Sequence, residues 1–131
     1  MQAKPILVEI APGELIDKIT ILEIKSGRIA NADKLRNVRV ELHLLKAARD
    51  KAMAPTQELA ALTAQLKQVN EKLWEIEASL RVCEHERDFG PKFIELARSV
   101  YCNNDKRAAL KRQINELLGS KLLEEKFYAE Y

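Results

Sequence analysis

Apolar positions recur every three or four residues through the middle of the chain. The steps between them are 3, 4, 3, 4, 3, 4 and 3, at Leu59, Leu62, Leu66, Val69, Leu73, Ile76, Leu80 and Cys83. A repeat of about 3.5 residues keeps one stripe of a helix facing a partner. The pattern therefore predicts one long helix from about Thr56 to about Arg87, with the Thr56 side chain as its N-terminal cap.

Two further helices are predicted before this stripe. Pro12 suits the first turn of a helix that weakens near Gly27. Asn31 or Asp33 is a suitable cap for the next helix, whose apolar positions again follow steps of three and four residues. Pro55 ends this helix, because proline disfavours helical backbone at the residue before it.

After the stripe, turn-forming residues divide the chain again. Residues 88–91, Asp-Phe-Gly-Pro, predict a turn, and a helix follows them. The polar run 102–105 predicts a break, with another helix from about Asp105 to Leu118 that Gly119 ends. Ser120 is a suitable cap for a last short helix that reaches Tyr131.

The stretch from Ile6 to Ile10 has a different pattern, in which apolar residues alternate with Leu7 and Glu9. It is consistent with one short strand, but a single strand has no partner within an otherwise helical chain. We expect the segment either to lie extended on the helices or to pair with another chain.

These elements predict an all-α fold with a single domain over residues 1–131. The connection around Pro55 is only a few residues long, which predicts an antiparallel hairpin of the helices on either side. The first of these helices is about 30 Å long and the second about 48 Å, so the first cannot cover the whole stripe. The uncovered positions, which need the first helix, the C-terminal helices or a second chain, are Leu73, Ile76, Leu80 and Cys83. We therefore expect a homodimer with these residues as the candidate interface.

Composition excludes several classes of protein. The 22 basic and 20 acidic residues give a net charge of +2, too balanced for a dedicated nucleic-acid binder. No apolar run approaches the roughly 20 residues of a membrane span, and no signal-peptide pattern is present. Together with only two cysteines, these features lead us to expect a cytoplasmic protein with reduced thiols.

The sequence contains no motif that indicates a particular reaction. The histidines and cysteines do not have metal-ligand spacing, and the glycines form no phosphate-binding loop. We therefore expect no catalytic residue, no metal and no cofactor, and the balance is against an enzyme.

Two polar clusters are candidates for ligand binding. Glu14, Asp17 and Lys18 share one face of the first helix, which is either a binding face or an ordinary solvated surface with ion pairs. Residues 103–107, Asn-Asn-Asp-Lys-Arg, stand at a predicted helix N-terminus. This end is either an anion site or a simple cap followed by a basic surface.

The same two clusters resemble the signature of a known family. Residues 14–25, ELIDKITILEIK, and residues 104–111, NDKRAALK, resemble the opening and C-terminal blocks of an uncharacterised family of short bacterial proteins. The resemblance continues through Gly119-Ser120-Lys121, Glu124-Glu125-Lys126 and Tyr128. It implies that the polar residues of the two end blocks meet in the fold. The candidate ligand-binding residues are Glu14, Asp17, Lys18, Thr20, Glu23, Lys25, Asn104, Asp105, Lys106, Arg107, Lys121 and Glu125.

Two hypotheses of function follow. The first is a non-enzymatic helical interaction or assembly module, which forms a homodimer or binds another cytoplasmic protein. The second is a small helical enzyme or ligand-binding accessory that acts on a sugar or sugar phosphate. The two charged end blocks, which contain acids, bases and a possible anion site, motivate the second hypothesis. The resemblance adds the context, because we associate the family with bacterial surface-polysaccharide and glycosyltransferase gene neighbourhoods.

Overall fold

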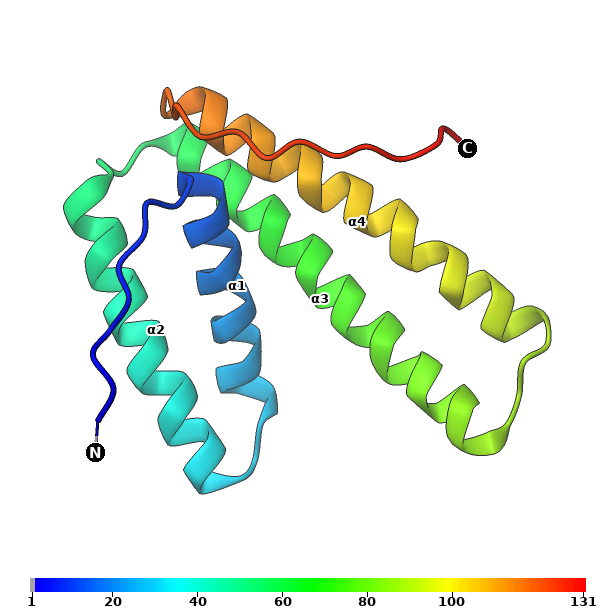
Figure 1. Cartoon of the computed structure of the whole chain (residues 1–131). Helices are drawn as coiled ribbons and strands as arrows, with labels where there is room; N and C mark the ends of the chain where they lie inside the picture. Colours follow the sequence, from blue (N-terminus) through cyan, green and yellow to red (C-terminus); the bar gives the residue numbers. More distant parts are fainter. Residues whose placement is uncertain (1) are drawn as a thin grey trace.

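The computed structural model describes residues 2–131, and within them the chain is all-helical (Figure 1). The helices are α1 (Pro12–Arg28), α2 (Ala32–Ala52), α3 (Gln57–Glu86) and α4 (Pro91–Leu117). The predicted all-α class is confirmed. No helix in residues 2–131 has the length and apolar character that crossing a membrane requires.

Local capping interactions begin α2 and α3 where the sequence predicts. The Asn31 side chain accepts hydrogen bonds from the backbone N–H groups of Asp33 and Lys34, at 3.1 and 3.0 Å. The Thr56 hydroxyl accepts one from the N–H of Leu59 at 3.1 Å. Each side chain satisfies helix N–H groups that have no partner within the helix. The predicted start of the long helix at Thr56 and its end near Arg87 are therefore confirmed.

The predicted break at residues 102–105 is wrong, because α4 runs through it without interruption. Asn103 is buried, and its side-chain amide donates to the carbonyl of Ser99, one turn earlier, at 2.8 Å. Neither proline nor glycine occurs between Pro91 and Leu117. Polar residues alone lower helix propensity only slightly, so tertiary packing keeps the helix continuous.

The predicted last helix over residues 120–131 is also wrong. The chain leaves α4 at Gly119, which has a φ of +65°, and then runs back beside α4 as an extended segment (Figure 1). Phe127 and Tyr128 are 101% and 76% exposed. A short segment that buries no apolar face lacks the tertiary packing that stabilises most short helices.

The helices pair differently from the predicted hairpin. α1 pairs with α2, α3 pairs with α4, and α1 also packs against α3 and α4. Among the described helices, α2 packs only on α1, and Figure 1 shows α1 between α2 and α3. The predicted α2–α3 hairpin is therefore wrong. The reason is the strongly apolar face of α1, whose buried side chains are Leu15, Ile16, Ile19, Leu22 and Ile24.

The core lies where α1, α3 and α4 meet. It consists of Ile16, Leu59, Leu66, Leu110 and Ile114, and Leu66 is completely buried. Farther along α3, the stripe is covered by α4 of the same chain, so that Ile76 and Cys83 are buried and Leu73 and Leu80 are half-buried. The second half of the stripe therefore needs no second copy. The homodimer stays a prediction, but the stripe on α3 no longer supports it, because α4 covers these positions.

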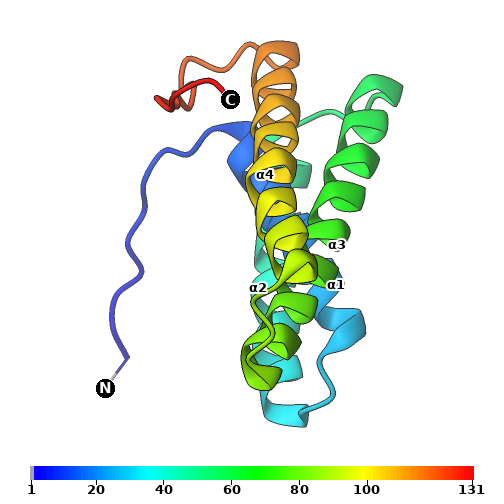
Figure 2. The same cartoon turned by 90° about the vertical axis from the view of Figure 1, so that its right-hand side faces the viewer.

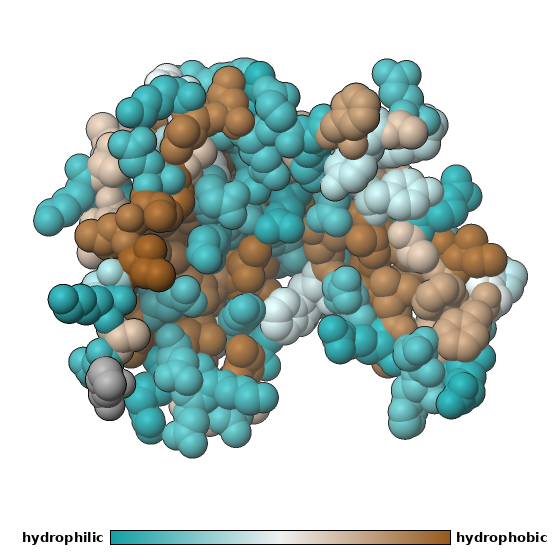
Figure 3. All heavy atoms as spheres, in the orientation of Figure 1, coloured by the Kyte–Doolittle hydropathy of each residue, from teal (hydrophilic) through white to brown (hydrophobic). Residues whose placement is uncertain are grey.

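The N-terminal segment, residues 2–11, is extended and has no strand partner within the described residues. Ile6, Leu7 and Val8 are 89%, 90% and 73% exposed. Figure 2 shows the segment standing apart from the helices. In Figure 3, apolar side chains gather at the left of the molecule, where Figure 1 places this segment. The segment thus presents apolar side chains that the rest of the chain does not cover.

Candidate functional site

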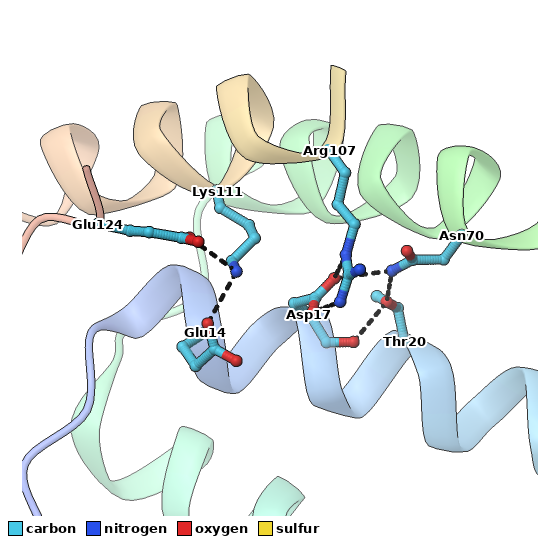
Figure 4. A network of polar contacts seen from close by, with 7 residues as sticks. All are labelled: Glu14, Asp17, Thr20, Asn70, Arg107, Lys111 and Glu124. Atoms are coloured by element: carbon cyan, nitrogen blue, oxygen red, sulfur yellow. Dashed lines mark hydrogen bonds and ion pairs between the residues drawn. The ribbon is translucent and has the colours of Figure 1, made fainter. Parts of the chain in front are cut away.

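The two polar blocks meet between α1 and α4, at an ion pair of Asp17 and Arg107 (Figure 4). The Arg107 guanidinium donates from Nε to Asp17 Oδ1 at 2.9 Å and from Nη2 to Asp17 Oδ2 at 2.5 Å. The Asp17 side chain is 1% exposed and the Arg107 side chain 30% exposed. The prediction that these blocks lie close together is confirmed. A two-point contact of this kind is stronger and more directional than a single ion pair.

A third helix completes the surroundings of Asp17. The Asn70 side chain on α3 donates to Asp17 Oδ1 and to the hydroxyl oxygen of Thr20, both at 2.9 Å. The Thr20 hydroxyl in turn donates to the backbone carbonyl of Asp17 at 2.8 Å. The carboxylate is therefore held by donors from two helices, as a buried charge requires.

A second group of charges lies one turn along α4, around Lys111 (Figure 4). Its ammonium is 2.7 Å from Glu14 Oε2 on α1 and 2.9 Å from Glu124 Oε2 on the C-terminal segment. The Lys111 side chain is only 10% exposed. Because a buried lysine charge is costly unless it is paired, the two carboxylates keep this cation in place.

The pairing sets the protonation of these groups. Burial lowers the pKa of Lys111, but the hydrogen bonds from its ammonium to Glu14 and Glu124 outweigh burial and raise it overall. The hydrogen bond with Lys111 lowers the pKa of Glu124. The hydrogen bond with Asp17 raises the pKa of Arg107. All three groups therefore stay charged near neutral pH.

A close backbone contact fixes the start of α1 against α4. The Gly13 N–H donates to the side-chain oxygen of Asn115 at 2.7 Å. A Cβ atom at Gly13 would lie 2.5 Å from the carbonyl oxygen of Lys111, which leaves no room for a side chain. This contact determines how deeply the first turn of α1 sits, and so where Glu14 and Asp17 point.

These charged groups border a small polar cavity of about 250 Å³. Its lining residues are Glu14, Asn104, Arg107, Ala108, Lys111, Glu124 and Lys126. Within the described residues, every buried side-chain nitrogen or oxygen has a hydrogen-bond partner. The arrangement thus holds charges in fixed positions, and any ligand in the cavity would compete with the existing ion pairs.

Several predicted site residues lie elsewhere. Glu23 faces α2 and α3, with Lys46 at 3.6 Å and Lys67 at 4.0 Å. Lys121 lies 3.5 Å from Glu9 of the N-terminal segment. Asp105 accepts a hydrogen bond from the Tyr131 hydroxyl, and Glu125 pairs with Arg112. Of the rest, Lys18 and Lys106 are exposed and Lys25 is half-buried, and none of the three lines the cavity.

Other members of the network were absent from the predicted set. Asn70 follows Leu66 by one helical turn and therefore lies next to the buried stripe. A polar residue at such a position indicates a buried polar contact, so the sequence contained a signal for Asn70. Asn115 follows Lys111 by the same interval, but nothing local indicates that it faces a backbone N–H. Glu124 belongs to a segment whose course along α4 is a tertiary feature.

Metal-ligating side chains are not gathered in the part of the chain that the structure describes. No group of three histidine, cysteine, aspartate or glutamate side chains could hold a metal ion there. Cys83 and Cys102 are both free. The Asp17, Arg107 and Lys111 groups therefore remain the main polar constellation.

Comparison with known proteins places the chain in a family. No curated protein and no solved structure matches it. A family model described as "Family of unknown function (DUF6165)" matches residues 6–130, which include both polar blocks and most of each extended terminal segment. The chain belongs to this family, DUF6165, and the predicted membership of a family of unknown function is confirmed.

Proposed function

We propose that the protein is a non-enzymatic interaction module that binds a partner protein through residues 6–10. The observation that carries this proposal is the exposure of Ile6, Leu7 and Val8, at 89%, 90% and 73%. Three consecutive apolar side chains in water are unusual for a surface and are typical of an interaction site.

The helical domain supports such a role by fixing the point from which the segment leaves. Residue 13 is bonded to Asn115 on α4, so the chain emerges at a defined position just before Pro12. The segment itself is extended, with backbone groups free to pair. An extended peptide of this kind can add to the edge of a partner's sheet or lie in an apolar groove.

The polar constellation also favours a binding module over an enzyme. Asp17 and Arg107 satisfy one another, and Lys111 is neutralised by two carboxylates. A general base or nucleophile must be able to reach a substrate with its reactive atom. Here the carboxylate of Asp17 is buried beneath its own partners.

The proposal is tested by comparing Leu7→Glu with Leu44→Glu. Leu7 is 90% exposed in the segment, and Leu44 is 62% exposed on α2, so neither charge should unfold the chain. Light scattering at micromolar concentration reports whether the partner is a second copy, and co-purification from the native host reports other proteins. We expect Leu7→Glu to abolish the dimer or the captured partner and Leu44→Glu to leave it. Equal binding by both variants would contradict the proposal.

A second candidate function is ligand binding in surface-polysaccharide metabolism. The polar cavity of about 250 Å³, with Asn104, Arg107 and Lys111 in its wall, is the observation that favours it. The cationic side chains of Arg107 and Lys111 suit the phosphate of a sugar phosphate, and the Asn104 amide suits its hydroxyl groups. Thermal unfolding with glucose 1-phosphate tests it. The midpoint should rise for the natural chain and stay unchanged for Asn104→Ala, whereas no rise with the natural chain would exclude this ligand.

A further inference from the structure

The C-terminal segment, residues 120–131, follows α4 and touches it at both ends (Figure 1). Near its start, Glu124 pairs with Lys111 and Glu125 pairs with Arg112, each at 2.9 Å. At its end, the Tyr131 hydroxyl donates to Asp105 and the Tyr131 ring lies edge-on to Tyr101, with 5.1 Å between ring centroids. The chain's own peptide thus occupies one face of α4.

The contacts that hold this segment are polar and partly open to water. Glu124 and Glu125 are 45% and 77% exposed. Phe127 is fully exposed and Tyr128 largely so, whereas Leu122 and Leu123 are 38% and 39% exposed and are the main apolar contribution of the segment. Exposed ion pairs stabilise a contact weakly, and a segment with no fully buried side chain opens more readily than the helices do.

The helix face beneath the segment is built to receive carboxylates. Lys111 and Arg112 are adjacent in the sequence, and each donates to one of two adjacent glutamates. Lys111 is also paired with Glu14 on α1 at 2.7 Å, so one of its two carboxylate partners remains when the C-terminal segment leaves. Arg112 keeps Glu116 at 3.1 Å on the same helix, which also orients it without the segment.

We propose that the face of α4 formed by Lys111 and Arg112 is a docking surface for an extended acidic peptide of a partner protein. The chain's own residues 120–131 occupy this surface until the partner displaces them. The partner peptide carries two adjacent carboxylates, as Glu124 and Glu125 do, because the two cations are preordered for that spacing. This surface is separate from residues 6–10, so the inference does not rest on the proposed function.

Competition with the linked segment is the central consequence. A peptide joined by a short flexible linker acts at an effective concentration on the order of millimolar. A free acidic peptide must therefore compete with this internal ligand, and weakening the internal ligand should expose the surface.

The experiment uses the full chain labelled with ¹⁵N and a synthetic peptide of residues 122–131 as the probe. Binding is followed by the NMR shifts of the Lys111 and Arg112 backbone amides. We expect Glu124→Gln with Glu125→Gln to lower the apparent Kd for the peptide at least tenfold relative to the natural chain. Adding Arg112→Gln to this variant is the matched control and should reverse the gain. A peptide with glutamine at both glutamate positions should not bind.

Two results would overturn the proposal. The first is equal peptide binding, or none, by the natural chain and the variant with both glutamates replaced. The second is a natural chain that is already a dimer whose residues 120–131 lie on the other copy, because a second copy would then fill the surface. Leu7→Glu serves as an independent check and should leave peptide binding unchanged, whatever becomes of the proposed function.

Discussion

Arg107 on α4 donates two hydrogen bonds to the carboxylate of Asp17 on α1, although 90 positions separate them in the sequence. The contact joins the first helix to the last one, across the point where α3 contributes Asn70. It explains why the two polar blocks belong together. They form one buried electrostatic link, which positions both the start of α1 and the middle of α4.

Replacing Asp17 by asparagine should destabilise the fold strongly. The change leaves the Arg107 cation and the Asn70 amide facing a neutral group, and breaking a buried pair costs about 3–5 kcal/mol. Urea unfolding followed by Trp74 fluorescence measures the effect. Arg28→Gln is the control, because its pair with Glu75 is exposed and should contribute only about 0–1 kcal/mol. Similar losses of unfolding free energy in both variants would show that the Asp17–Arg107 pair contributes no more than an exposed ion pair.

Leu66→Ala should cost roughly 2–5 kcal/mol of unfolding free energy. Leu66 is fully buried among Ile16, Leu110 and Ile114, so the truncation leaves a cavity between three helices. Leu44→Ala on the exposed face of α2 is the comparison and should change stability by no more than about 0.5 kcal/mol. A loss below that level for Leu66→Ala would mean that this position does not face a core.

The two glycines of α1 should respond to alanine in opposite directions. At Gly13 a Cβ would meet the Lys111 carbonyl oxygen at 2.5 Å and Asn115 Oδ1 at 2.9 Å, so α1 must shift away from α4. Overpacking of this kind costs about 1–3 kcal/mol. At Gly27 nothing lies within 4 Å, and alanine is the better helix former by about 1 kcal/mol. Thermal unfolding of both variants measures the two effects. A Gly13→Ala protein as stable as the natural chain would contradict the close contact of Gly13 with α4.

Acid should release the C-terminal segment from α4. The hydrogen bond with Lys111 lowers the pKa of Glu124 below its usual 4.5, so the folded contact favours the ionised carboxylate. The stabilisation is complete above that usual value and is lost as the pH falls through the lower pKa of the folded state. The ¹⁵N relaxation of residues 122–126 between pH 7 and pH 3 measures the release. Glu124→Gln should already be released at pH 7, and a segment equally ordered at both pH values would contradict the prediction.

Local signals in the sequence determined where α1, α2 and α3 begin, and where α3 ends. Asn31 and Thr56 cap the N–H groups of the residues that follow them, and the spacing from Leu59 to Cys83 describes one face of one helix. These interactions lie within a few residues, so they can be identified without knowing the rest of the fold. The same reasoning failed at residues 102–105, where packing against α1 and α3 outweighs a weak local preference.

Only the tertiary structure decided which faces meet. An apolar stripe shows that a helix has a partner, but it does not identify the partner, and so α4 and α1 rather than α2 cover α3. For the polar residues, the family signature indicated that the end blocks belong together. The buried position of Asp17 and the roles of Asn70 and Glu124 depend on contacts between segments far apart in the sequence. Such contacts follow from the packing of the helices as a whole, because a side chain's surroundings are set by every element that reaches it.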